Sequence, residues 1–246
     1  MSSALIGYTG FVGGNLARQM RFDEFYNSKN IDYIRGRKFD LVVCAGAPGR
    51  KWYANEYPAE DHTSICRLLA AICEIIATRF VLISTVDVYV VPREVDEDIR
   101  PTITGLQPYG RNRLLLEDSV RGTFRDRATI LRLPALFGPG LKKNALYDLI
   151  NDHDVDKIPA NAAYQWYPLS GLSDSISWAT GVSCPVVNLV SDPIEMSAIQ
   201  WMFFPAARLG PVSDSASSYS VLSHYGRISE SFILSRMAQF LQETSR

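Results

Sequence analysis

The sequence predicts an α/β fold in which helices cover both faces of a doubly wound parallel sheet. Short, continuously apolar runs alternate with segments of helical apolar spacing over the first two thirds of the 246 residues. Within the runs, apolar and polar residues do not alternate, which indicates strands buried on both faces. A glycine-spaced turn joins the first run to the first helical segment. These three observations together favour this fold class over an all-helical or an antiparallel one.

The expected strands are the apolar runs. The run at 40–45 reads Asp-Leu-Val-Val-Cys-Ala and ends in the turn Gly-Ala-Pro-Gly. The run at 80–84 reads Phe-Val-Leu-Ile-Ser, which is typical of a central strand. On the same grounds we expect strands at 3–7, 24–28, 40–45, 80–84, 128–133 and 185–190.

The expected helices carry apolar residues at intervals of three and four. The segment at 59–78 has isoleucine and leucine at this spacing, and the segment at 108–120 opens with a proline, which suits a first helical position. Helices are therefore predicted at 11–20, 59–78, 108–120 and 229–243. Little sequence separates the strand at 24–28 from the strand at 40–45, so the strand–helix pair usual in such folds is expected to be trimmed there.

The chain changes character after Pro134. Gly138-Pro139-Gly140, an aromatic run at 164–168 and a serine-rich segment at 212–223 are typical of loops. We expect one domain over 1–246, with a small lobe built mainly from residues 134–186 and 196–246. In folds of this kind the C-terminal part usually forms the substrate pocket.

Composition excludes several classes of function. The net charge of −1 gives no sign of electrostatic binding to nucleic acid. Apolar runs are too short to span a bilayer, and no secretion signal precedes the first strand, so a cytoplasmic protein is expected. The three histidines show no metal-ligand spacing. The four cysteines are interpreted as small buried residues in a reducing compartment.

The first turn is the strongest functional signal. Glycines recur as Gly7-x-x-Gly10-x-x-Gly13, after a strand and at the start of a helix. Such a turn brings the backbone and the free N–H groups of a helix start close to a pyrophosphate. We therefore predict a dinucleotide site, although an ordinary glycine-rich turn has the same pattern. Its residues are Gly7, Thr9, Gly10, Phe11, Val12 and Gly13.

Five motifs in this order resemble the extended short-chain dehydrogenase/reductase family, the nucleotide-sugar epimerases, dehydratases and 4-ketoreductases. The likeness spans about three quarters of the chain and implies a Rossmann-type fold. The motifs lie at 7–13, 44–46, 82–89, 108–113 and 131–140.

The resemblance implies a catalytic set. Tyr109 matches the family's tyrosine and Thr85 its hydroxyl residue, with Ser84 beside it. A phenol has a pKa near 10, and a cation one helical turn away would bring that pKa toward neutrality. Arg113 stands where the family has lysine, and its planar fork differs from an ammonium. It is expected to tune Tyr109 and hold the cofactor ribose. An active enzyme, a slow one and a binding protein without catalysis all remain open.

The cofactor is expected to be NADP, with NAD as the alternative. No acid ends the second strand, and Lys29 there could meet a 2′-phosphate, helped by Ser28 and Asn27. Arg35 and Arg37 lie close in sequence, while a solvated lysine is the simpler interpretation of Lys29. The resemblance adds further cofactor contacts at Cys44, Ala45, Gly46 and Pro134.

A nucleotide-linked sugar is the implied substrate, with Asn144, Trp166 and Tyr167 as candidate contacts. Each has a plainer interpretation: Asn144 as the cap of a helix at 145–150, and the two aromatic residues as packing of the lobe. Asp96 and Glu97 are expected in an exposed loop. The alternative function is a non-catalytic NAD(P)-binding sensor or partner subunit. Relatives often pair through the helices expected at 59–78 and 108–120, which makes a homodimer the default.

Overall fold

The computed structural model describes residues 2–244, and they fall into two compact units. The first unit comprises 2–91, 97–133 and 170–188, and the second comprises 92–96, 134–169 and 189–244. The C-terminal lobe was expected to include residues up to 186. Residues 170–188 instead belong to the first unit, because the strand at 186–188 pairs with its sheet.

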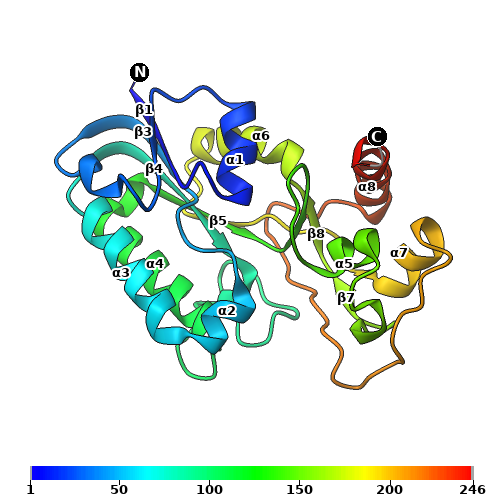
Figure 1. Cartoon of the computed structure of the whole chain (residues 1–246). Coiled ribbons are helices and arrows are strands. Elements are labelled where there is room, and N and C mark those ends of the chain that lie inside the picture. Colours follow the sequence, from blue (N-terminus) through cyan, green and yellow to red (C-terminus); the bar gives the residue numbers. More distant parts are fainter. Residues whose placement is uncertain (1, 245–246) are drawn as a thin grey trace. The chain divides into compact units, whose positions relative to one another are not determined.

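A six-stranded sheet, all parallel, forms the centre of the first unit and confirms the predicted fold class (Figure 1). The strand order is β2-β1-β3-β4-β5-β9. Most of β4 and all of β5 are buried, as expected for strands covered on both faces. The strands are β1 (Ser3–Ile6), β2 (Glu24–Tyr26), β3 (Lys38–Cys44), β4 (Ile76–Thr85), β5 (Ala128–Leu133) and β9 (Val186–Asn188).

Helices cover this sheet on both sides, with α1 and α6 on one face and α3 and α4 on the other (Figure 1). Their apolar faces form the core with the strands, and Phe80 of β4 stacks on Phe124 of α4 with ring centroids 4.1 Å apart. The helices are α1 (Phe11–Gln19), α2 (Lys51–Glu56), α3 (Pro58–Ile72), α4 (Pro108–Phe124) and α6 (Leu172–Gly181).

Two helix ends differ from the prediction by several residues, and β4 begins at Ile76 rather than at the expected residue 80. The helix expected at 59–78 ends at Ile72, and Ile76 already pairs with Lys38 of β3. The isoleucines at 75 and 76 fit a helical and a strand pattern equally well, and pairing with β3 decides between them. Helix α4 runs four residues beyond its expected end, to Phe124. The trimmed connection is present: a single 3-10 turn, η1 (Ile31–Ile34), lies between β2 and β3.

The second unit has its own core, to which Phe137, Trp166 and Ile233 belong. Its sheets are small, β10 with β7 antiparallel and β6 with β8 parallel. The elements are β6 (Ala135–Phe137), α5 (Ala145–Asn151), β7 (Ala163–Tyr164), β8 (Trp166–Pro168), β10 (Ile194–Glu195), α7 (Met196–Phe203) and α8 (Glu230–Thr244). Further 3-10 turns lie at Val86–Val88 (η2), Arg125–Arg127, Val155–Lys157 and Leu169–Gly171.

The cysteines only partly match their interpretation as buried residues. Cys44 and Cys184 are buried, whereas Cys66 and Cys73 are exposed at the surface of α3 and at its C-terminal end, and all four are free. Of the helices in residues 2–244, none combines the length and apolar character needed to cross a bilayer.

Candidate functional site

The glycine turn is a tightly packed piece of backbone. Gly7 has φ +87°, and a Cβ there would lie 2.3 Å from the carbonyl oxygen of Ala45. A Cβ on Gly13 would lie 2.1 Å from the carbonyl oxygen of Gly7. Only glycine fits at either position. The turn is thereby pressed against the end of β3, where Cys44, Ala45 and Gly46 lie.

The start of α1 suits a negatively charged group. Gly10 is its N-cap, and within residues 2–244 no side chain caps this end. Thr9 and Gly10 are exposed, while Phe11 and Val12 are half-buried. Helix starts leave backbone N–H groups unpaired and carry a partial positive charge. The residues present therefore fit a dinucleotide pyrophosphate, in the cradle where added Cβ atoms would collide.

Asn27 shapes the end of β2. Its Nδ2 donates to the hydroxyl of Tyr8 at 3.2 Å, and its Oδ1 accepts from the backbone N–H of Lys29 at 2.8 Å. The backbone N–H of Gly7 donates to the carbonyl of Tyr26 at 2.7 Å, which ties β2 to the glycine turn. Asn27 thus acts as a turn residue, and Ser28 and Lys29 are left exposed.

The nearby arginines already have acidic partners. Arg35 pairs with Asp32 at 3.2 Å and with Glu74, and Arg37 pairs with Glu24. Their positive charge is therefore largely balanced. Among the described residues, Lys29 has no ion pair, which leaves it as the cation available beside the end of β2.

Thr85 and Tyr109 come together at the carboxyl end of β4. Thr85 is the last residue of β4 and Tyr109 lies in the first turn of α4, where the Thr85 hydroxyl acts to lower the pKa of the phenol. The Thr85 Oγ1 also accepts from the backbone N–H of Asp87 at 3.1 Å. A Cβ on Gly110 would lie 2.1 Å from the carbonyl oxygen of Asp87, so glycine permits this approach of α4.

The pKa of Tyr109 is raised above its usual value near 10, mainly because the surrounding protein desolvates the phenolate. The positive charges of Arg113 and Lys51 and the hydrogen bond from Thr85 act to lower this pKa, while Asp87 raises it. The sequence predicted a net lowering by the cation at i+4. That prediction was wrong because desolvation is the larger effect, and the phenol remains protonated at neutral pH.

Arg113 is buried and already bound. Its guanidinium pairs with Asp61 of α3 and donates to the carbonyl of Pro48, both inside the first unit. Its Cζ lies 4.1 Å from the ring centroid of Tyr109, and its Nε has no hydrogen-bond partner among residues 2–244. Asp61 also accepts from Asn112 Nδ2 at 2.7 Å. The expectation that Arg113 reaches the ribose is not supported by this arrangement.

Ser84 contacts a different group of residues from Thr85, because side chains of successive strand residues point to opposite faces of the sheet. Its hydroxyl donates to Glu117 Oε1 at 2.6 Å. Glu117 is fully buried and accepts from Arg132 Nε at 3.0 Å and from a second nitrogen of that guanidinium at 2.6 Å. Arg132 also donates to the hydroxyl of Tyr89 at 2.7 Å. The sequence did not point to this buried network, because its members lie far apart along the chain.

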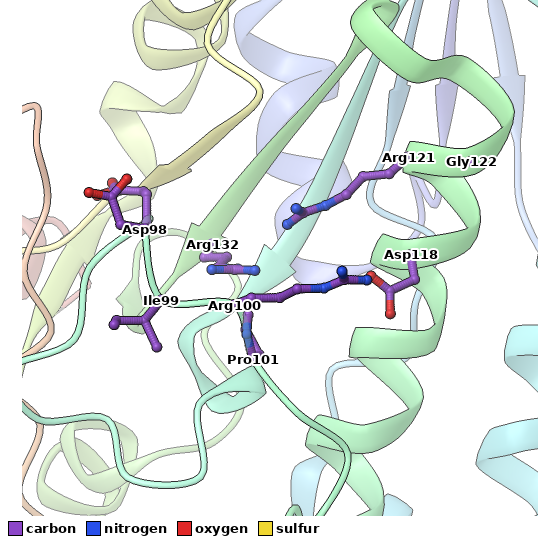
Figure 2. A pocket seen from close by; sticks show the side chains of 9 residues that line it. Asp98, Ile99, Arg100, Pro101, Asp118, Arg121, Gly122 and Arg132 are labelled. Atoms are coloured by element: carbon purple, nitrogen blue, oxygen red, sulfur yellow. The ribbon is translucent and has the colours of Figure 1, made fainter.

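A cavity of about 540 Å³ lies beside this network (Figure 2). The loop at 97–101, the second half of α4 and Arg132 line it, and neither Thr85 nor Tyr109 is among the lining residues. Glu97 was expected in an exposed loop but is half-buried, and its Oε1 accepts the backbone N–H of Asn188 at 2.8 Å.

The candidate substrate contacts belong to the second unit. Asn144 caps α5, because its Oδ1 accepts the backbone N–H of Tyr147 at 3.1 Å, which confirms the plainer interpretation. Trp166 is fully buried in the core of that unit, and Tyr167 is 2% exposed. The Nε1 of Trp166 lacks a hydrogen-bond partner within the described chain. Pro134 directly follows β5.

A family model described as the NAD dependent epimerase/dehydratase family matches residues 24–160. A dTDP-4-dehydrorhamnose reductase structure from Yersinia enterocolitica is 17% identical, with 98% of this chain and 99% of that chain covered at a TM-score of 0.77. The reductase of the same name from Bacillus anthracis, in complex with NADP, is 15% identical, with 99% of each chain covered at a TM-score of 0.72.

A UDP-glucose 4-epimerase structure with UDP-glucose, from Thermotoga maritima, is 13% identical, with 90% of this chain and 89% of that chain covered at a TM-score of 0.68. No curated protein matches the chain. The low identities mean that these structures share the fold, while the family match spans more than half of the chain.

Proposed function

Since this chain belongs to the NAD-dependent epimerase/dehydratase family, we propose that it is an NAD(P)-dependent enzyme that acts on a nucleotide-linked sugar. The observation that carries this proposal is the meeting of Thr85 and Tyr109 at the carboxyl end of β4. Ligands of open parallel sheets bind at this edge. The glycine turn at the end of β1 lies at the same edge, because parallel strands end on the same side.

The proposed cofactor is NADP, with NAD as the alternative; when bound, its nicotinamide accepts or donates a hydride. Gly7, Gly10 and Gly13 would lie against the pyrophosphate, where a side chain would collide with Ala45 or with the turn itself. Exposed Lys29 at the end of β2 would meet a 2′-phosphate. The relative from Bacillus anthracis binds NADP, which supports this choice.

Tyr109 would act as acid or base, and Thr85 would bind the reacting oxygen of the sugar. The raised pKa of Tyr109 keeps its proton on the phenol, ready to be donated to a carbonyl oxygen as that oxygen gains negative charge. This protonation state favours reduction of a keto-sugar over oxidation of an alcohol. The two dTDP-4-dehydrorhamnose reductases of the same fold support this direction.

A second candidate is a non-catalytic NAD(P)-binding protein. It is favoured by Arg113, whose guanidinium is bound to Asp61 and Pro48 and so cannot take the place of a mobile lysine. In that case Tyr109 would remain a neutral, packed phenol. The dinucleotide site would then serve a sensor protein or a partner subunit.

The family resemblance also implies an oligomeric state. A homodimer would form through α3 and α4, and light scattering coupled to gel filtration tests this directly.

Calorimetric titration with NADPH and NADH, followed by turnover assays, tests the function. Wild-type protein should bind NADPH more tightly than NADH and reduce dTDP-4-dehydrorhamnose or a related 4-keto nucleotide sugar. Tyr109→Phe should lower turnover by about 10²–10⁴-fold with little change in NADPH affinity. Binding of NADPH without any turnover on a panel of such sugars would favour the second candidate. Failure to bind either nucleotide would refute both.

A further inference from the structure

Helix α2 brings a second cation to the Tyr109 site. The backbone N–H of Tyr109 donates to Asn55 Oδ1 at 3.0 Å, which fixes α2 against the first turn of α4. Lys51 lies four residues before Asn55, so both side chains leave α2 on the same face. That face therefore lies toward Tyr109 and toward the turn that carries Asp87.

Lys51 is joined to this site by a chain of polar contacts. Its Nζ pairs with Asp87 Oδ1 at 2.8 Å, and the lysine side chain is 47% exposed while the aspartate is 20% exposed. The other carboxylate oxygen of Asp87 accepts a hydrogen bond from the Thr85 hydroxyl at 3.4 Å. The Asp87 carboxylate thus links the Lys51 ammonium to the Thr85 hydroxyl, one oxygen contacting each.

The charges that face Tyr109 come from three elements. Arg113 lies on α4, Asp87 on η2 and Lys51 on α2. The charge of Arg113 is balanced by buried Asp61, and its Nη atoms donate to Asp61 and to the carbonyls of Pro48 and Tyr109. Lys51 balances Asp87 in the same way. Without Lys51, the Asp87 carboxylate would lose this positively charged partner beside the phenol.

We propose that Lys51 is a positioning residue of the Tyr109 site, whose ammonium offsets the negative charge of Asp87 beside the phenol and holds that carboxylate in place. This inference rests on the proposed role of Tyr109 as acid or base. Lys51 offsets the charge of Asp87 and holds its carboxylate in place, so that less net negative charge faces the developing phenolate.

The ionisation of Tyr109 in the ligand-free protein is the direct test. Tyrosine labelled with ¹³C at the ζ carbon is followed by NMR from about pH 8 up to the alkaline limit of the folded protein, with Tyr109→Phe identifying the resonance. Lys51→Met should raise the pKa of Tyr109 by a few tenths to about one unit, since a half-exposed charge acts partly through solvent. Asp87→Asn should lower it, and Lys51→Arg should restore the wild-type value.

Two further variants separate charge from structure. The double variant Lys51→Met/Asp87→Asn removes both charges and should return the Tyr109 pKa to near the wild-type value. Arg50→Met is the matched control, because Arg50 is the preceding residue but lies over the Tyr53 ring, 4.6 Å from its centroid. An unchanged Tyr109 pKa in Lys51→Met, or an equal shift in Arg50→Met, would overturn the proposal.

This test is independent of turnover. If Tyr109→Phe keeps full activity, the proposed function fails even where the pKa of Tyr109 responds to Lys51. If Tyr109→Phe is inactive, the alkaline limb of the kcat profile should move with Lys51→Met and return with Lys51→Arg, because activity is lost as the phenol ionises. A loss of activity in Lys51→Met that Lys51→Arg does not rescue, with the Tyr109 pKa unmoved, would reduce Lys51 to a structural contact.

Discussion

Arg113→Lys, which restores the residue type usual in the family, should destabilise this protein. The guanidinium of Arg113 serves two partners at once, the Asp61 carboxylate and the Pro48 carbonyl, and it also stacks on the ring of Tyr109. An ammonium is a single point charge and cannot keep this forked geometry. Lysine would keep the ion pair with Asp61 and leave the Pro48 carbonyl without its donor.

The magnitude follows from the lost bond. A hydrogen bond to a charged group contributes about 1.5–3 kcal/mol, so Arg113→Lys should lower the free energy of unfolding by about 2 kcal/mol. For a chain of this size that corresponds to a fall in Tm of about 4–8 °C. Arg113→Met would leave the buried Asp61 carboxylate unpaired and should cost about 3–5 kcal/mol.

Thermal unfolding followed by circular dichroism measures these shifts. Arg111→Lys is the matched control: it lies on the same helix, is exposed, and should leave Tm within about 2 °C of wild type. Asp61→Asn combined with Arg113→Met should be less destabilising than the sum of the two single variants, because the two residues are coupled. A wild-type Tm for Arg113→Lys would refute the assignment of the guanidinium to Pro48 and Asp61.

Two further predictions concern buried groups of the first unit. Glu117→Gln leaves the Arg132 guanidinium buried without its counter-charge, and should lower the calorimetric stability by about 3–5 kcal/mol; an unchanged Tm would contradict the buried pair. Burial raises the pKa of Cys44 from 9.0 to about 12. Between these two pKa values the thiol of Cys44 ionises in the unfolded chain but stays neutral in the folded one. The stability that the neutral thiol contributes is therefore complete below about pH 9 and is lost as pH rises toward 12. Cys44→Ala should therefore show a shallower fall of Tm with pH over that alkaline range, and an identical slope would argue against a buried neutral thiol.

Local patterns were enough to predict the fold and the glycine turn. Strand β5 begins and ends where its apolar run does, and Gly7 and Gly13 occupy positions that no side chain could share. Such features can be predicted from residues that are close together in the sequence, because a strand buried on both faces requires apolar residues and a tight turn requires glycine. The meeting of Thr85 with Tyr109 followed from the family motifs, which encode one end of β4 and the start of α4.

The sequence did not predict which charged residues form ion pairs with one another. Arg113 pairs with Asp61, 52 residues earlier, and Lys51 with Asp87, 36 residues later. Nothing in the local pattern of either partner marks the other, since ion pairs form wherever packing brings opposite charges together. The protonation of Tyr109 was misjudged for the same reason: a cation one turn away is visible in the sequence, whereas desolvation depends on every element packed around the phenol. The sequence by itself determined the fold class, the glycine turn and the identity of the hydroxyl pair. Only the tertiary structure decided which cation faces that pair, because the balance of burial and charge exists only once distant segments are packed together.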